Sequence, residues 1–394
     1  MNEKMAHFGK FIKSCWSKKL LCDESSLRTR GNAVTLFFSG DEAYAAMVDE
    51  IAQARSFVHL EMYMFLSDQV GQEIARALSR KARTGVAVRV VYDAIGSAEA
   101  DELMFEQMRD AGVRVEVFRP VAPWRKRSGI LGRNHRKNLI IDGRVAFTGG
   151  MNLGEVWSQK ASGAGAWRDT HMKLEGPAAA ACQHFFKEAW RKVGGETLSE
   201  ECHYRQDELG PGESECVIVG GRGISRRRAI RRLYSRAFHE AQDLVVMTVP
   251  YFVPPKRVLD VMRRRALAGL EVRVLVPRNS DVPFADWIRE GLYSSLMDDG
   301  VNFSEYTASV LHAKSLVFDH RVAIVGSANF DYLSFSFNWE LAVVLDDPAI
   351  VSQLMEQYQR DLESSEKVDW DWAESRPWWR RVLAQIGAAL IRRL

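Results

Sequence analysis

Two short segments of the sequence carry the same reactive side chains at the same spacing. Each has a histidine, a lysine two residues later, then an aspartate and an asparagine. The two sets are His135, Lys137, Asp142 and Asn152, and His312, Lys314, Asp319 and Asn329. In an extended strand, side chains two residues apart point to the same face. Each segment therefore brings an imidazole and an ammonium group to one spot, and two such segments together would form a site for a phosphodiester.

These residue types suit displacement at phosphorus. Negative charge grows on the nonbridging oxygens as a nucleophile arrives, so the site needs cations or hydrogen-bond donors, which the lysines and asparagines supply. One imidazole can attack phosphorus while the other protonates the departing alkoxide, and the roles then reverse for an incoming alcohol. The residues alone leave open which histidine attacks. With two lysines to stabilise the charge, the chemistry needs no metal and no other cofactor.

The two segments are the ends of two longer repeats. Residues 54–65 resemble residues 241–252, and residues 84–91 resemble residues 268–275, with nearly constant offsets between the copies. Within each repeat, apolar runs alternate with stretches of helical period, which predicts an α/β fold with buried strands. The predicted helices span residues 70–84, 98–111, 255–268 and 284–299.

Each motif is predicted to continue into a β-hairpin. The apolar run after Lys137 turns at Asp142, and the run after Lys314 turns at Asp319. Both aspartates belong to the motif, but they lie several residues from the imidazoles. We therefore expect them to stabilise the turn rather than to contact a substrate.

This pattern resembles the phospholipase D superfamily, whose members carry His-x-Lys-(four residues)-Asp followed by a Gly-Gly/Ser-x-Asn element. The segments at 61–65, 250–254, 134–137 and 334–340 look like bacterial cardiolipin synthases, in the subtype without N-terminal transmembrane helices. The resemblance covers roughly residues 35 to 390. It implies two tandem phospholipase D-like α/β/α repeats related by a pseudo-twofold axis, with one shared active site.

The resemblance also implies roles for individual residues. His135 would be the nucleophile that forms a phosphohistidine, and His312 the general acid. In that family an acidic residue downstream of each motif orients the histidine, and Asp169 and Glu340 occupy those places, each roughly thirty residues after its histidine. The candidate substrate-binding residues are Glu61, Tyr63 and Tyr251. For the first two, an ordinary strand position is an equally good interpretation.

Length and composition limit the remaining possibilities. The chain of 394 residues suits two domains, and a net charge of +3 gives no indication of nucleic-acid binding. The five cysteines are odd in number and lack Cys-x-x-Cys spacing, which indicates a reducing cytoplasm rather than a disulfide framework or a zinc site. No apolar stretch reaches the roughly 18 residues that a spanning helix needs.

The domain boundaries are expected from these patterns. In order, we expect a basic amphipathic segment at 1–34, repeats at 35–195 and 216–365 joined by a linker at 196–215, and a tail at 366–394. In the tail, Trp379, Leu383, Ile386 and Leu390 fall on one helical stripe between arginines. That composition is typical of a helix lying in a lipid interface. Packing of the stripe on the protein core is the alternative.

The resemblance implies an enzyme that transfers a phosphatidyl group between phospholipids, converting two phosphatidylglycerols to cardiolipin and glycerol. Phosphatidylethanolamine is a second candidate lipid. We expect a monomer that binds an anionic phospholipid membrane peripherally, on the cytoplasmic side of the inner membrane, and binds no nucleic acid. The alternatives are a hydrolytic phospholipase D, a nuclease of the same superfamily with a basic, aromatic-lined groove, and a membrane-binding protein without activity.

Overall fold

The computed structural model describes residues 26–121, 131–198, 210–221, 228–375 and 377–391. Most of the expected amphipathic N-terminal segment, residues 1–25, lies outside these ranges. The end of that segment does not: residues 26–34 form part of strand β1 (Ser26–Phe37), which pairs within the sheet. The folded part of the first repeat therefore begins earlier than the expected boundary at residue 35.

The first repeat alternates strands and helices. Its elements after β1 are α3 (Gly40–Gln53), β2 (Phe57–Met62), α4 (Gln69–Arg83), β3 (Ala87–Asp93), α5 (Glu102–Asp110), β4 (Arg114–Phe118), β5 (Asn138–Ile141), β6 (Val145–Gly149), α6 (Gln159–Ser162), β7 (His171–Glu175) and α7 (Pro177–Lys192). Helix α4 matches its predicted span closely. Helix α5 begins later than predicted, because the Asp101 side chain accepts the Leu103 N–H and caps the helix there.

The second repeat has the same order, with two short strands added within it and further elements added at its end. Its elements are β8 (Ser214–Gly221), α9 (Arg228–Glu240), β9 (Leu244–Thr248), β10 (Phe252–Val253), α10 (Lys256–Leu267), β11 (Glu271–Pro277), α11 (Pro283–Asp298), β12 (Val301–Tyr306), β13 (Ser315–Phe318), β14 (Val322–Gly326), β15 (Phe330–Asp331), α12 (Tyr332–Ser336), β16 (Glu340–Asp346), α13 (Pro348–Glu363), β17 (Ser365–Val368), α14 (Trp370–Ser375) and α15 (Trp378–Ile391). The helices predicted at 255–268 and 284–299 are confirmed as α10 and α11.

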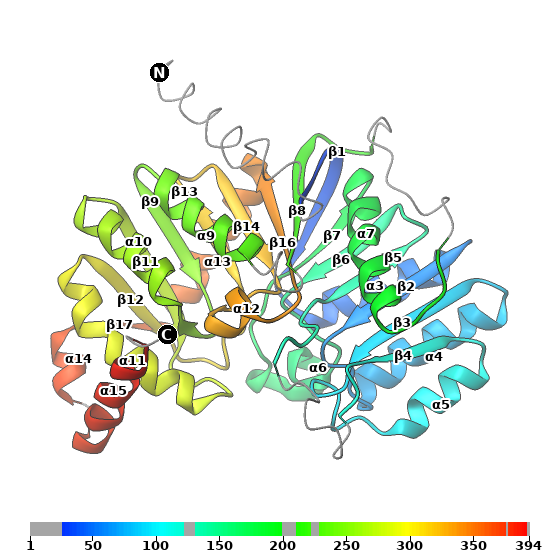
Figure 1. The fold of residues 1–394 in the computed structure, drawn as a ribbon, viewed down its shortest axis with the longest axis horizontal. Coiled ribbons are helices and arrows are strands. Elements are labelled where there is room, and N and C mark those ends of the chain that lie inside the picture. The colour runs from blue at the N-terminus through cyan, green and yellow to red at the C-terminus, as the bar shows by residue number, and fades with distance from the viewer. Residues whose placement is uncertain (1–25, 122–130, 199–209, 222–227, 376, 392–394) are drawn as a thin grey trace.

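One sheet of 15 strands crosses both repeats (Figure 1), in the order β17-β12-β11-β9-β13-β14-β16-β8-β1-β7-β6-β5-β2-β3-β4. Counted outward from the central antiparallel pair of β1 and β8, corresponding strands occupy corresponding places in the two halves. This arrangement confirms the duplication. The sheet is mixed. Strands β2, β3 and β4 run parallel, as do β9, β11 and β12, whereas the motif hairpins β5–β6 and β13–β14 and the edge strand β17 are antiparallel.

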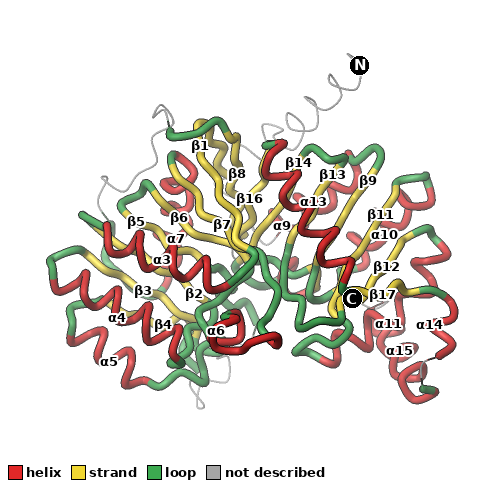
Figure 2. Tube along the Cα trace, turned by 180° about the vertical axis from the view of Figure 1, so that it is seen from behind, coloured by secondary structure: helices red, strands yellow, loops and turns green. Residues whose placement is uncertain are grey.

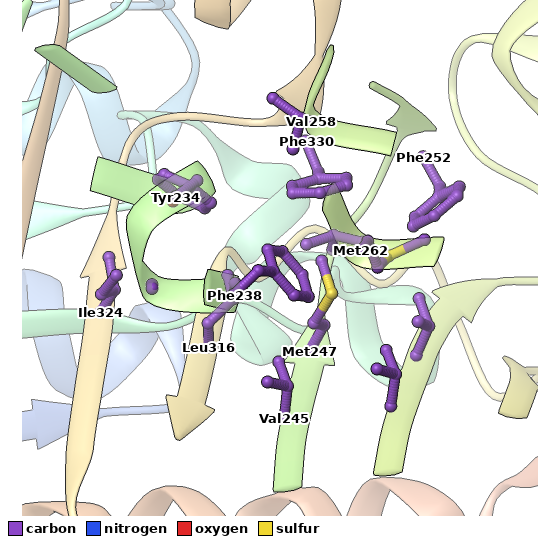
Figure 3. Packing of buried hydrophobic residues seen from close by; sticks show 14 of the residues in the cluster. Tyr234, Phe238, Val245, Met247, Phe252, Val258, Met262, Leu316, Ile324 and Phe330 are labelled. Carbon is purple, nitrogen blue, oxygen red and sulfur yellow. The ribbon is translucent and has the colours of Figure 1, made fainter. Parts of the chain in front are cut away.

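Helices pack on both faces of the sheet, as the opposite views in Figures 1 and 2 show. Helices α3, α4 and α5 form one apolar cluster with strands of the first repeat. Helices α9, α10 and α11 form another with strands of the second repeat. In the latter, Phe238, Met247, Met262 and Phe330 interdigitate between α9, α10 and the strands (Figure 3). A third cluster, containing residues of α7 and α13, draws on the inner strands of both repeats. The repeats therefore share a core, which fixes one against the other.

The C-terminal tail packs on the second repeat through one face of α15, which lies beside α11 in Figure 1. Ala384 is buried, a Cβ at Gly387 would lie 2.8 Å from the Ile288 Cα, and Arg380 lies 3.5 Å from Glu290. Other apolar side chains of the helix are exposed, namely Trp378 (72%), Trp379 (46%), Val382 (46%) and Ile386 (53%). Of the expected stripe, Leu383 is half-buried, and the Leu390 side chain lies outside the described part. Among the described residues, no helix combines the length and apolar character required to cross a bilayer.

Candidate active site

The two motif histidines lie where the repeats meet. His135 and His312 occupy the extended segments that precede β5 and β13. The His135 N–H donates to the Trp339 carbonyl at 2.9 Å, and the His312 N–H donates to the Arg168 carbonyl at 2.7 Å. Each histidine is therefore held by the backbone of the other repeat. This places the shared site at the junction between the two halves of the chain.

The acidic partners of the histidines are crossed between the repeats. His135 Nδ1 lies 3.1 Å from both carboxylate oxygens of Glu340, and His312 Nδ1 lies 2.6 Å from Asp169 Oδ2. The sequence argument placed each acid after the histidine of its own repeat, and that assignment was wrong. The reason is the backbone connection: Asn134 is bridged to Trp339, and Arg168 is bridged to Leu311. Glu340 directly follows Trp339, so it lies beside His135. Asp169 directly follows Arg168, so it lies beside His312.

Both carboxylates are buried and held by further donors. Glu340 accepts a hydrogen bond from the Ser327 hydroxyl at 2.5 Å, and Asp169 accepts one from the Trp157 indole at 3.2 Å. Ser327 and Gly150 occupy equivalent places in the two motifs. A Cβ at Gly150 would lie 2.0 Å from Asp169 Oδ1, so only glycine leaves room for that carboxylate. The Gly-Gly and Gly-Ser elements therefore accommodate the partners of the histidines.

The motif lysines lie beneath the imidazoles. Lys137 Nζ donates to the His135 carbonyl at 2.8 Å. Lys314 Nζ donates to the His312 carbonyl and lies 2.7 Å from His312 Nδ1 and 3.0 Å from Nε2. Both lysines are fully buried. Two buried lysines, each bound to the backbone carbonyl of its motif histidine, provide the charge that a bound phosphodiester requires.

Burial and neighbouring charges set the protonation of these groups. Burial lowers the pKa of His312 to about 4, with Lys314 acting in the same direction, and burial also lowers the pKa of His135. Burial lowers the pKa of Lys314 to about 8 and that of Lys137 well below its usual range. Without a bound anion, both imidazoles are therefore neutral near neutral pH, as a nucleophilic nitrogen must be.

The carboxylates remain ionised in spite of their burial. Burial raises the pKa of Asp169, but Lys314 and His312 hold it below its ordinary value. Burial likewise raises the pKa of Glu340, and His135 holds it below its ordinary value. An ionised carboxylate on Nδ1 keeps a proton on that nitrogen and leaves the Nε2 lone pair free to act.

The motif asparagines differ in their contacts. The Asn152 side-chain oxygen accepts the Met64 N–H at 3.2 Å, which turns its NH₂ group away from that strand. The Asn329 N–H donates to the Ser334 hydroxyl at 3.2 Å, and among the described residues the Asn329 Oδ1 has no hydrogen-bond partner. The Asn152 amide thus keeps N–H donors that a phosphate oxygen could use, whereas the Asn329 side chain also hydrogen-bonds the Asp331 carboxylate.

Two of the three candidate substrate-binding residues flank the histidines. The Tyr63 ring lies edge-on to His135 at 4.7 Å between centroids, and Tyr251 lies edge-on to His312 at 6.3 Å. Glu61 differs: its side chain is fully buried and accepts a hydrogen bond from the Asn134 amide at 2.7 Å. It cannot reach a substrate there, so the expected contact is not found. Its role is to hold the segment before His135.

The motif aspartates lie away from the imidazoles and bind backbone donors. The Asp142 carboxylate accepts the N–H groups of residues 55–57, and the Asp319 carboxylate accepts those of residues 242–244. Their φ angles of 53° and 50° belong to the left-handed region. They connect each hairpin turn to the start of the neighbouring strand. The contacts therefore agree with the structural role that was expected, and not with a catalytic one.

Sequence reasoning missed Arg136, which links the repeats behind the site. Its fully buried guanidinium donates to the carbonyls of Phe185 in the first repeat and Gly221 and Glu340 in the second. Its position between His135 and Lys137 was a usable signal, because alternation points it to the opposite face. Trp157, by contrast, has no motif spacing that would have revealed its contact with Asp169.

Comparison with known proteins identifies relatives of the whole arrangement. The family described as "Cardiolipin synthase, PLD-like domain" matches residues 47–161 and 234–362. The cardiolipin synthase of Geobacillus sp. (strain WCH70) is 32% identical over 93% of this chain and 72% of its own length. The cardiolipin synthase of Clostridium perfringens (strain ATCC 13124) is also 32% identical, over 94% of this chain and 78% of its own length.

Solved structures share the fold. The phosphatidylserine synthase of Haemophilus influenzae Rd KW20 superimposes with a TM-score of 0.71, over 95% of this chain and 97% of that one, at 14% sequence identity. The polyphosphate kinase of Porphyromonas gingivalis gives a TM-score of 0.55 over 84% of this chain and 50% of that one, at 15% identity. At these identities the likeness extends to the fold alone.

Proposed function

The chain belongs to the cardiolipin synthase family of phospholipase D-like enzymes, and from this membership we propose that it makes cardiolipin from phospholipids by phosphatidyl transfer. The observation that carries the proposal is the crossed pair of His135–Glu340 and His312–Asp169, with a lysine beside each imidazole. A neutral imidazole and a protonated one, each with an ionised carboxylate partner, can divide the roles of nucleophile and acid. Both halves of the site come from one chain, which supports a monomer as the active unit.

The reaction runs in two balanced steps. His312 takes up a proton when the anionic phosphodiester binds. His135 Nε2 then forms a bond to the phosphorus of one phosphatidylglycerol as the bond to its headgroup oxygen breaks, and the His312 imidazolium gives that oxygen its proton, releasing glycerol. His312 then takes the proton from the headgroup hydroxyl of a second phosphatidylglycerol. The new oxygen–phosphorus bond forms as the phosphohistidine bond breaks, giving cardiolipin and restoring both imidazoles. Lys137 and Lys314 stabilise the charge on the nonbridging oxygens in both steps.

The roles of the two histidines can be separated with an activated substrate. p-Nitrophenolate is a stable anion that can leave a phosphodiester without taking up a proton. Cleavage of such a substrate therefore needs no general acid. We expect His312→Ala to release p-nitrophenol in a single-turnover burst, whereas His135→Ala releases none. The reverse result would assign the nucleophile to His312 and leave the rest of the proposal intact.

We propose that the exposed face of α15 contacts the membrane, at the cytoplasmic side of the inner membrane. Its support is the cluster of Trp378, Trp379, Val382 and Ile386 on a helix whose other face packs on α11. Indoles prefer the headgroup region of a bilayer. Replacing Trp378 and Trp379 with Ser should weaken sedimentation with phosphatidylglycerol vesicles about tenfold. Leu267→Ser, which changes an exposed apolar residue on α10, is the matched control and should leave binding unchanged.

One experiment tests the proposed reaction against its alternatives. Purified protein is incubated with phosphatidylglycerol vesicles, with and without phosphatidylethanolamine, and the lipid products are weighed by mass spectrometry. Cardiolipin and free glycerol are expected. Phosphatidic acid alone would indicate a hydrolase, and cleavage of DNA instead of lipid would indicate a nuclease. Vesicle binding that proceeds without any product would contradict the enzymatic proposal.

A further inference from the structure

The two halves of the site are not equivalent around the histidines. The alignment of residues 84–91 with residues 268–275 places Asp281 where the first repeat has Ser97. The Ser97 hydroxyl is occupied by the backbone, because it donates to the Tyr63 carbonyl at 3.1 Å and accepts the Phe65 N–H at 3.0 Å. Asp281 is exposed, and within the described part of the chain its side chain makes no such contact with the backbone. Of these two corresponding positions, the one on the His312 side therefore carries a carboxylate and the one in the first repeat does not.

Tyr251 holds this carboxylate. Its hydroxyl donates to Asp281 Oδ1 at 2.6 Å, and its ring lies edge-on to His312. Burial raises the pKa of Tyr251, so the phenol stays protonated and remains a donor. Strand β10 begins directly after Tyr251 and pairs in parallel with β15, which begins directly after Asn329. Tyr251 therefore lies level with the amide of the second motif. Among the described residues, Asp281 Oδ2 has no hydrogen-bond partner.

Such a carboxylate cannot serve the phosphate, because both are negatively charged. It suits instead a group that donates hydrogen bonds and lies a few bonds beyond the phosphoester oxygen. In the proposed reaction, His312 handles first the alcohol that leaves and then the alcohol that enters. Both are glycerol headgroups with a second hydroxyl, so one subsite next to His312 can serve both steps.

Resting on that proposed function, we propose that Asp281, oriented by Tyr251, binds the free hydrogen-bond donors of the headgroup alcohol at His312. The ligand chemistry is a small alcohol with a further hydroxyl or an ammonium group, as in glycerol or ethanolamine. A retained acceptor alcohol also excludes water from the phosphohistidine. The subsite therefore favours transfer over hydrolysis.

The test compares two lipids that differ only in the proposed contact. Phosphatidylmethanol has the same phosphodiester as phosphatidylglycerol but lacks a second hydroxyl. We expect Asp281→Asn to lower kcat/KM for phosphatidylglycerol roughly tenfold to a hundredfold, from the strength of a hydrogen bond to a charged group. Phosphatidylmethanol has no hydroxyl and can only be the donor, so its reaction is measured as single-turnover release of methanol, which should stay within about twofold. Asp260→Asn, on helix α10 of the same repeat, is the matched control and should change neither.

A third lipid distinguishes the two headgroup types. With phosphatidylethanolamine as donor, a larger loss in Asp281→Asn than for phosphatidylglycerol identifies the ammonium group, and an equal loss identifies hydroxyl recognition. Both results support the subsite. Tyr251→Phe should reduce the preference for phosphatidylglycerol over phosphatidylmethanol in the same direction. An equal loss on phosphatidylglycerol and phosphatidylmethanol, or no loss on either, overturns the proposal.

A binding measurement keeps this inference independent of the proposed reaction. Glycerophosphoglycerol, the deacylated headgroup diester, should bind the wild-type protein more tightly than dimethyl phosphate in calorimetric titration. Asp281→Asn should abolish that preference. If the wild-type protein forms no cardiolipin but shows this preference, the proposed function fails and the subsite stands. If cardiolipin forms and the preference is missing, only the subsite fails.

Discussion

Replacing Glu340 with Gln tests whether the carboxylate from the second repeat prepares His135 for attack. Both carboxylate oxygens of Glu340 lie 3.1 Å from His135 Nδ1, and the carboxylate also accepts a hydrogen bond from the Ser327 hydroxyl. With an amide at this position, the NH₂ group can face Nδ1 and force the proton onto Nε2. The nucleophilic lone pair would then point away from phosphorus.

The size of the effect can be worked from this contact. A hydrogen bond to a charged group contributes about 1.5–3 kcal/mol, which corresponds to roughly tenfold to 150-fold in rate. Forcing the wrong tautomer adds to this, and an amide in place of the carboxylate of a Ser-His-Asp triad costs about 10⁴-fold. We therefore expect Glu340→Gln to lower kcat at least about 100-fold, with little change in KM.

The assay is cardiolipin formation from phosphatidylglycerol vesicles under saturating lipid, with thermal unfolding measured in parallel. Ser327→Ala is the matched control: it removes the hydroxyl that binds the same carboxylate but leaves the contact with His135, so its loss should be much smaller. The reasoning is refuted if Glu340→Gln folds normally and keeps kcat within about twofold, or if Ser327→Ala is equally impaired.

Further predictions concern charge and stability. Because burial lowers the pKa of Lys314 to about 8, the ammonium group loses its proton as pH rises through that value, and kcat/KM should fall there. In a pH–rate profile, Lys314→Arg should shift this fall in kcat/KM to higher pH. A fall that stays at the same pH would assign it to another group. Asp142→Ala should lower the free energy of unfolding, measured in urea, by about 2 kcal/mol, while kcat per folded molecule is retained. Asp142→Asn should lower the free energy of unfolding less, because asparagine tolerates the positive φ. Burial lowers the pKa of His59 to about 3, so the unfolded chain binds more protons below about pH 6.5 and stability falls as pH drops from there toward 3. His59→Gln should flatten that dependence, and an unchanged slope would contradict it.

The chemistry of the site could be predicted from the sequence because it depends on residue types at short, regular spacings in the chain. A histidine and a lysine two residues apart, repeated with a distant asparagine, identify the reacting groups without any knowledge of the fold. The alternation of apolar runs and helical stretches likewise predicted α4, α10 and α11 closely. These features depend on neighbours in the chain, which sequence periodicity records.

The pairing of acids with histidines could not be predicted in this way. Asp169 and Glu340 were identified, but their partners depend on how β1 and β8 join the two half-sheets, which is a contact between residues far apart in the chain. For the same reason, Glu61 was expected at the surface of the site although it is fully buried. Alternation predicts on which face of the sheet a side chain lies, but it does not predict which other residues cover that face and bury the side chain.

The crossed pairs also bear on the history of the chain. A protein with a single repeat would have lacked the carboxylate for its own histidine, so it could have acted only as a symmetric homodimer in which each subunit completed the other. Fusion of two copies preserved that dependence and let the surroundings diverge, as Asp281 and Ser97 have. A chain divided between the repeats should accordingly be inert as separate fragments and regain activity by complementation when they are mixed.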